Sequence, residues 1–244
     1  MYMLLYKPLG YEKYQHKGAI RLKTKDLWIV LVYVLIQYSG LYGVSFLLNS
    51  GIYEGIDKKT ANLEAVALWG CISFIAGLII ILIVLRKPIF EGIRNLTYPT
   101  TRSIIKWSVF GYLVTMVTQI LCNLFLILVF DLNKGSENTQ AIINITKLNP
   151  AFIVIPSLIA PILEEIIFRG IIFKRLSNRL PFFIAASISS VIFSFMHGDL
   201  PFFLSYFLIG FIFCYLYKRS NSIVVPIITH MLMNSFVVFQ QLNF

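Results

Sequence analysis

The sequence predicts an all-α protein, a polytopic membrane helix bundle with about seven transmembrane helices. Hydrophobic residues make up 58% of the 244 residues and charged residues only 13%, whereas soluble domains average about 45–50% and about 25%. Long uncharged runs recur along the chain, and a membrane-crossing helix needs about 20 such residues. The clusters of Lys and Arg between these runs alternate from one side of the membrane to the other. These observations exclude a water-soluble globular protein.

Seven apolar segments are expected to be the spans. In chain order they are residues 28–48, 65–85, 107–130, a segment that begins near residue 151, and then 182–196, 201–217 and 223–239. The fifth is the shortest and lies near the lower length limit for a span. Residues 131–150 are expected to form a loop. The chain thus divides into a tail (1–26), N-terminal transmembrane helices (27–130) and a C-terminal membrane core (131–244), all in one membrane domain.

The positive charges predict how the chain is oriented in the membrane. Seventeen of the 21 Lys and Arg residues, counting Arg169 at the end of the fourth span, fall in the tail and the loops on one side, and four fall in the loops on the other. Cytoplasmic loops collect Lys and Arg, so we expect a multi-pass cell-membrane protein with a cytoplasmic N-terminus and an external C-terminus. The net charge of +10 is confined to the tail and loops, where attraction to anionic lipid headgroups explains it. Membrane lipids are therefore expected partners, and nucleic acid is not.

Three ionisable side chains lie within the fourth expected span: Glu164, Glu165 and Arg169. Each such side chain costs about 2.5–3.5 kcal/mol near the bilayer centre, so three on one helix indicate a polar site enclosed by protein. Glu165 and Arg169 are four residues apart with the acid first, the arrangement favoured for an ion pair on one helix face. Glu164 points about 100° away from Glu165 and has no cation nearby in sequence, which makes it the candidate general base. The alternative is a structural polar link between helices.

Two further pairs of polar and aromatic residues lie in apolar segments. His230 and Asn234 are four residues apart in the last span and share a face, where both need partners in a low dielectric. Their N–H groups could stabilise a developing oxyanion. His197 ends the fifth span, one turn after Phe193, and the small residues Ala185 and Ser189 on the same face permit close helix packing. Packed or interfacial histidines remain the alternative for both.

Helix arithmetic places these residues at unequal depths. At 1.5 Å per residue, Glu164 lies about 20 Å from the outer end of its span, and His230 lies about 12 Å from the cytoplasmic side, so these two depths agree. His197 comes out about 24 Å from that side, too far outward. A break at Pro156 or Pro161, an interfacial segment at 181–185, or different span boundaries would reconcile the three.

Taken in order, these motifs resemble those of a known family. They read Glu164-Glu165-x-x-x-Arg169, Phe193-x-x-x-His197 and His230-x-x-x-Asn234. This order and spacing are similar to those of the CAAX protease and bacteriocin-processing family (CPBP, also called Abi), whose members are termed intramembrane metalloproteases. The resemblance covers residues from about 150 to 239, within the predicted core, and implies a family core that can have eight helices including interfacial ones.

The resemblance implies an intramembrane endopeptidase that cleaves a membrane-associated peptide or protein, in peptide maturation, bacteriocin immunity or regulatory proteolysis. It implies that Glu164 activates water with the help of His197. His230 and Asn234 would hold the scissile carbonyl oxygen. The supporting residues would be Glu165, Arg169 and Phe193.

The residue types alone do not determine whether the reaction requires a metal ion. Glu164, His197 and His230 could bind one zinc ion with an open fourth position. No HExxH pair supplies two ligands from one helix turn, however. We expect a metal-free mechanism, with a zinc site as the alternative.

Two other classes of protein compete with the protease. A non-catalytic membrane regulator or immunity protein of the same fold would keep the bundle and bind partners. A proton-coupled transporter would also bury Glu, His and Arg, but no repeat symmetry between the two halves supports it.

Overall fold

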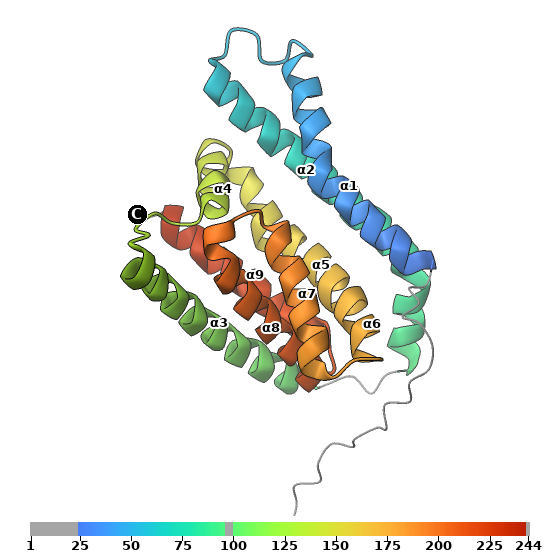
Figure 1. Ribbon diagram of the computed structural model, residues 1–244. Helices are drawn as coiled ribbons and strands as arrows, with labels where there is room; N and C mark the ends of the chain where they lie inside the picture. The colour runs from blue at the N-terminus through green and yellow to red at the C-terminus, as the bar shows by residue number, and fades with distance from the viewer. Residues whose placement is uncertain (1–23, 96–99, 243–244) are drawn as a thin grey trace, which may run out of the picture.

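The computed structural model describes residues 24–95 and 100–242, with the side chains of 87–95 excepted, and this part of the chain consists of helices and the turns that connect them (Figure 1). Six helices are long and apolar enough to cross a membrane. They are α1 (Thr24–Leu48), α2 (Lys58–Asn95), α3 (Thr101–Phe130), a composite helix over Pro150–Ser177, α8 (Phe203–Ser220) and α9 (Val224–Leu242). The fifth expected span is α7 (Phe182–Met196), a shorter apolar helix of 15 residues. The predicted all-α membrane bundle is confirmed. Nearly all of the predicted tail lies outside the described residues.

Local sequence explains where several helices begin and end. The Thr100 hydroxyl accepts a hydrogen bond from the Ser103 N–H at 3.3 Å and so caps the start of α3. Asp131 ends α3 in the left-handed region (φ 51°), where Asp is tolerated better than most residues. Gly198, with φ +67°, follows the end of α7, and glycine adopts this conformation without a Cβ penalty. The chain therefore turns directly after His197.

One helix was not predicted. Residues 131–150 were expected to form a loop, but α4 (Glu137–Leu148) occupies most of this segment. The Ser136 hydroxyl caps it by accepting from the Thr139 N–H at 3.1 Å. A search for long uncharged runs overlooks a 12-residue helix with charged ends, whose buried residues are Ile143, Ile145 and Thr146. The loop prediction was wrong for this reason.

The composite helix explains the unequal depths. It runs without a break through two π-helical segments, Ile155–Ile159 and Ile166–Phe173, and continues to Ser177 because Arg169 is fully buried and does not mark a helix end. Glu164 lies 13 residues before Ser177, and His197 lies 15 residues after Phe182. Both are therefore about 20–23 Å from the turn that joins the two helices. Of the three alternatives, the structure supports different span boundaries: the fourth span ends later than predicted, and neither proline breaks its helix.

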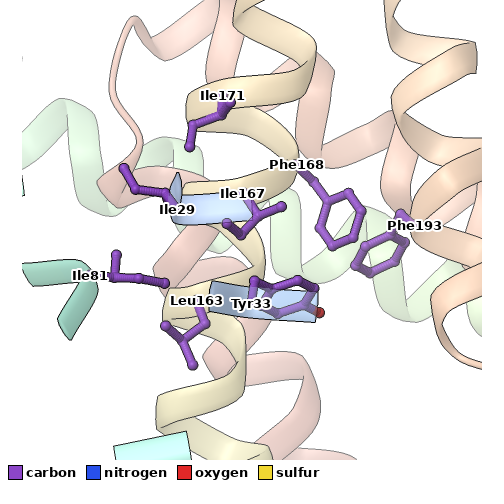
Figure 2. Close-up of a cluster of buried hydrophobic side chains, with 8 residues drawn as sticks. All are labelled: Ile29, Tyr33, Ile81, Leu163, Ile167, Phe168, Ile171 and Phe193. Carbon is purple, nitrogen blue, oxygen red and sulfur yellow. The ribbon is translucent and has the colours of Figure 1, made fainter. Parts of the chain in front are cut away.

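The helices form a bundle flanked by a long hairpin. In Figure 1, α1 and α2 run antiparallel along one flank, α3 lies on the opposite flank, and α5 (Ala160–Glu165), α7, α8 and α9 lie between them. The hairpin contacts the bundle through the cluster in Figure 2, where Ile29 and Tyr33 of α1 pack with Leu163 and Ile167 of the composite helix. Many large apolar side chains of α1, α2 and α3 are exposed on the outside of the bundle, as expected for surfaces that face lipid.

Candidate active site

A buried ion pair forms the base of the site. Glu165 Oε1 accepts a hydrogen bond from Arg169 Nη1 at 2.9 Å, and both side chains are fully buried. The predicted i, i+4 pair is therefore present. Arg169 Nη2 also donates to the Gly210 carbonyl of α8 at 2.9 Å. Its guanidinium carbon lies 4.5 Å from the centroid of the Phe193 ring, within cation–π distance. The pair thereby ties the composite helix to α7 and α8.

His230 lies between the two adjacent carboxylates. Its Nδ1 is 2.9 Å from Glu165 Oε1, and its Nε2 is 3.8 Å from Glu164 Oε2. The first contact is a hydrogen bond, and the second is longer than one. His230 is 2% exposed and Glu164 12%, so Glu164 is the most accessible member of this group. Although neighbouring side chains diverge on a helix, one imidazole ring here reaches both acids.

His197 is fixed in orientation by two contacts. Its Nδ1 lies 2.8 Å from the Phe193 carbonyl, an acceptor, so Nδ1 carries the proton and Nε2 of the neutral ring has a free lone pair. The ring stacks on Tyr206 of α8 with centroids 4.0 Å apart. The Tyr206 hydroxyl lies 3.1 Å from Ser136 Oγ and accepts from Asn138 Nδ2 at 3.4 Å. The start of α4 therefore helps to position His197.

The Asn234 side chain bonds to a main-chain carbonyl that has no partner within its own helix, because the residue that would donate to this carbonyl is a proline. In the first π-helical segment the Ala160 N–H bonds to the Ile155 carbonyl, five residues back. The next donor in this pattern would be residue 161, but Pro161 has no N–H. The Pro156 carbonyl instead accepts a hydrogen bond from Asn234 Nδ2 at 2.9 Å. One of the two N–H bonds of the Asn234 amide is thus used, and the other is available.

A cavity of about 220 Å³ adjoins these residues. His197, Asn234 and Pro156 are among its lining residues, and most of the others come from α3, α4, α8, α9 and the segment between α3 and α4. Glu164 and His230 are not among its lining residues.

The predicted site residues therefore fall into two neighbouring groups. Glu164, Glu165, Arg169 and His230 form the ion-pair cluster, and His197 and Asn234 face the cavity. Phe193 joins the groups, because its ring centroid is 4.5 Å from that of His197 and 6.1 Å from that of His230.

The donor set does not fit a metal ion. Within the described residues, no group of three or more His, Cys, Asp and Glu side chains is placed to hold one. The ligands considered for zinc, namely Glu164, His197 and His230, are thus not gathered around one point. Two of the four imidazole nitrogens also have partners: Nδ1 of His197 faces a carbonyl, and Nδ1 of His230 faces Glu165.

Sequence reasoning missed Tyr206 and the hydrogen bond from Asn234 to the Pro156 carbonyl. Tyr206 lies in an ordinary aromatic-rich span, and no local spacing connects it to His197. The two prolines were considered only as helix breakers. Their spacing of five residues was an available signal, since a π-helical turn bonds residues five apart.

Comparisons with known proteins identify the family and two relatives of the chain. Residues 146–236 match the family model described as type II CAAX prenyl endopeptidase Rce1-like. The chain is 40% identical over 220 residues to the protein named "Putative membrane peptidase YdiL" from Bacillus subtilis strain 168, covering 90% of each chain. It is 34% identical over 228 residues to the "Membrane-embedded CAAX protease MroQ" from Staphylococcus aureus strain USA300, covering 89% of this chain and 90% of the relative.

No solved structure shows a significant match. The two relatives align over nearly the full length, and the matched family region includes every residue of the two groups described above. The chain therefore belongs to the Rce1-like type II CAAX prenyl endopeptidase family (CPBP/Abi) and is a multi-pass intramembrane protease.

Proposed function

We propose that the chain hydrolyses a peptide bond in a membrane-associated peptide or protein, with Glu164 as the base that activates water. The observation that carries this proposal is the pairing of two adjacent carboxylates with one buried imidazole: Glu165 holds His230 at 2.9 Å, while Glu164 remains at 3.8 Å and partly accessible. A carboxylate without a close hydrogen-bonded partner in this cluster is free to take a proton from water. It can then return the proton to the leaving amine.

The remaining residues supply the other parts that amide hydrolysis requires. His230 Nδ1 lies against Glu165, and when both ring nitrogens carry a proton, Nε2 can donate to the carbonyl oxygen. The free N–H of Asn234 is the second donor to the oxyanion. His197 assists Glu164 through the lone pair on Nε2.

The proposed reaction is metal-free. The described donors do not converge on one point, and this supports a mechanism in which no step uses a metal ion. Zinc chemistry remains the alternative, and its test is given in the Discussion.

The proposed orientation has the N-terminus in the cytoplasm and the C-terminus outside, on the basis of the Lys and Arg distribution. In this orientation the segment between α3 and α4, which forms one end of the cavity, faces outward. The substrate would reach the site from that side.

The test is terminal-peptide mass spectrometry on membranes from cells that express the wild type, Glu164→Gln or Glu54→Gln. Glu54 is an exposed residue of the α1–α2 connection and provides the same chemical change away from the site. Glu164→Gln should reduce cleavage by about 10²–10⁴-fold, the usual contribution of a general base, at unchanged abundance. Glu54→Gln should cleave as the wild type does.

Two results would contradict the proposal. Full cleavage by Glu164→Gln would eliminate Glu164 as the base. The second result is that cells with and without the protein yield the same peptide termini but differ in a cellular phenotype. The chain would then act as a non-catalytic regulator or immunity protein and not as a protease.

A further inference from the structure

The cavity beside His197 and Asn234 carries polar groups with no partner. Gln119 Oε1 on α3 and Ser205 Oγ on α8 are both buried, both line the cavity, and neither has a hydrogen bond within the described structure. Ser205 is only 4% exposed. A buried polar atom without a partner is costly in an apolar environment. Two such atoms, on two helices that line one cavity, therefore indicate a ligand with its own hydrogen-bonding groups.

The chemistry of the lining narrows the class of ligand. Side-chain amides come from α3, α4 and α9, among them Asn123, Asn138 and Gln241, and each amide both donates and accepts. Lys134, which is exposed, is the lining residue with a fixed charge, and no carboxylate of the described chain lines the cavity. A metal cation lacks ligands here, and a phosphate headgroup lacks the cluster of cations that it needs. Amides and hydroxyls match the alternating N–H and C=O groups of a peptide main chain.

The chemistry of the lining also bears on the conformation of that peptide. From Asn234 to Gln241 the lining follows α9 for about 10 Å. In a helix the main-chain N–H and C=O groups bond to one another, so they are not available to the amides and hydroxyls of the lining. An extended segment leaves these groups free to bond to the cavity wall.

We propose that this cavity binds an extended peptide segment next to the scissile bond, with Gln119 and Ser205 as main-chain binding residues. The inference rests on the proposed function and adds to it the conformation in which substrate is bound. It also assigns a role to α3 and to the segment before α4, both of which precede the region that matches the family model. The segment enters at the end of the bundle near Lys134 and Asn138.

The test measures peptide capture without cleavage. The full-length Glu164→Gln protein is immobilised in phosphatidylcholine nanodiscs, and the probe is a chymotryptic digest of a bacterial proteome. Bound peptides are eluted and quantified by mass spectrometry. Gln119→Leu and Ser205→Ala are each added to this parent, with Gln240→Leu and Ser177→Ala as controls, because Gln240 is exposed on α9 and neither control residue lines the cavity.

We expect Gln119→Leu and Ser205→Ala each to reduce capture at least tenfold, while both controls retain it. A melting temperature that is unchanged or raised should accompany the loss, since each substitution removes a buried polar atom without a partner. A purely structural role would lower the melting temperature instead. If Gln119→Leu does not fold, Ser205→Ala decides.

Three outcomes would overturn the proposal: no capture by the parent, equal capture by the cavity variants and the controls, or a phospholipid found in the cavity by native mass spectrometry in place of peptide. Cleavage by the otherwise wild-type protein is measured in parallel. If the wild type cleaves substrate and neither Gln119→Leu nor Ser205→Ala changes cleavage or capture, this inference is wrong and the proposed function still stands. Absence of cleavage by the wild type removes the proposed function itself.

Discussion

Removing Arg169 should destabilise the protein far more than removing a comparable arginine at its surface. Arg169→Met leaves the fully buried Glu165 carboxylate without its arginine partner and frees the Gly210 carbonyl. Breaking a buried pair in this way costs about 3–5 kcal/mol, a large fraction of the about 5–15 kcal/mol by which most proteins are stable. Arg175→Met is the matched control. Arg175 pairs with Asp26 at 2.6 Å but is 26% exposed, so its pair is worth about 0–1 kcal/mol.

The assay is equilibrium unfolding in mixed detergent and SDS micelles, which gives the free energy of unfolding. Combining Arg169→Met with Glu165→Gln removes both charges and should recover most of the loss. Cleavage should stay low in the combined variant, because Glu165 no longer holds His230 in place. Equal losses for Arg169→Met and Arg175→Met would refute the argument that burial gives the Glu165–Arg169 pair its importance.

Two further predictions concern the site. Pro161→Ala restores an N–H that competes with Asn234 for the Pro156 carbonyl, so cleavage should fall by up to about 10²–10³-fold, the effect of losing one oxyanion donor. The control Pro201→Ala, in the exposed turn before α8, should change cleavage little. Undiminished cleavage by Pro161→Ala would show that the Pro156 carbonyl does not position Asn234 for catalysis. Purified, active protein should contain far less than one zinc per chain by elemental analysis and should resist chelators, so stoichiometric zinc, or chelator inhibition that zinc reverses, would replace the metal-free mechanism.

Several helix boundaries could be predicted because they coincide with a change in local polarity. The first and third spans end at Leu48 and Phe130, and the fifth occupies residues 182–196, as charge-free runs indicated. The same criterion failed at Arg169, because a charge with a buried partner does not end a helix. It also failed for α4, whose burial depends on the helices around it.

The site could be predicted only as far as spacing along one helix reaches. The Glu165–Arg169 pair follows from a separation of four residues, and the shared face of His230 and Asn234 follows in the same way. The contact between Glu165 and His230 joins residues 65 apart and requires α9 to pack against the composite helix, which no local pattern specifies. Gln119 and Asn123 were a missed signal, since two amides one turn apart in a span already indicate a polar surface.

The Glu165–Arg169 pair also bears on how the chain is made. Phe193 and Gly210, which contact Arg169 in the finished protein, follow the composite helix in the chain and leave the ribosome after it. In sequential insertion the Arg169 guanidinium therefore reaches the bilayer before these neighbours do. Because the counter-charge lies one turn earlier on the same helix, the two can neutralise each other during insertion, when each alone would cost about 2.5–3.5 kcal/mol. An acid at position 165 thus makes the segment insertable during biogenesis, before it orients an imidazole in the mature enzyme.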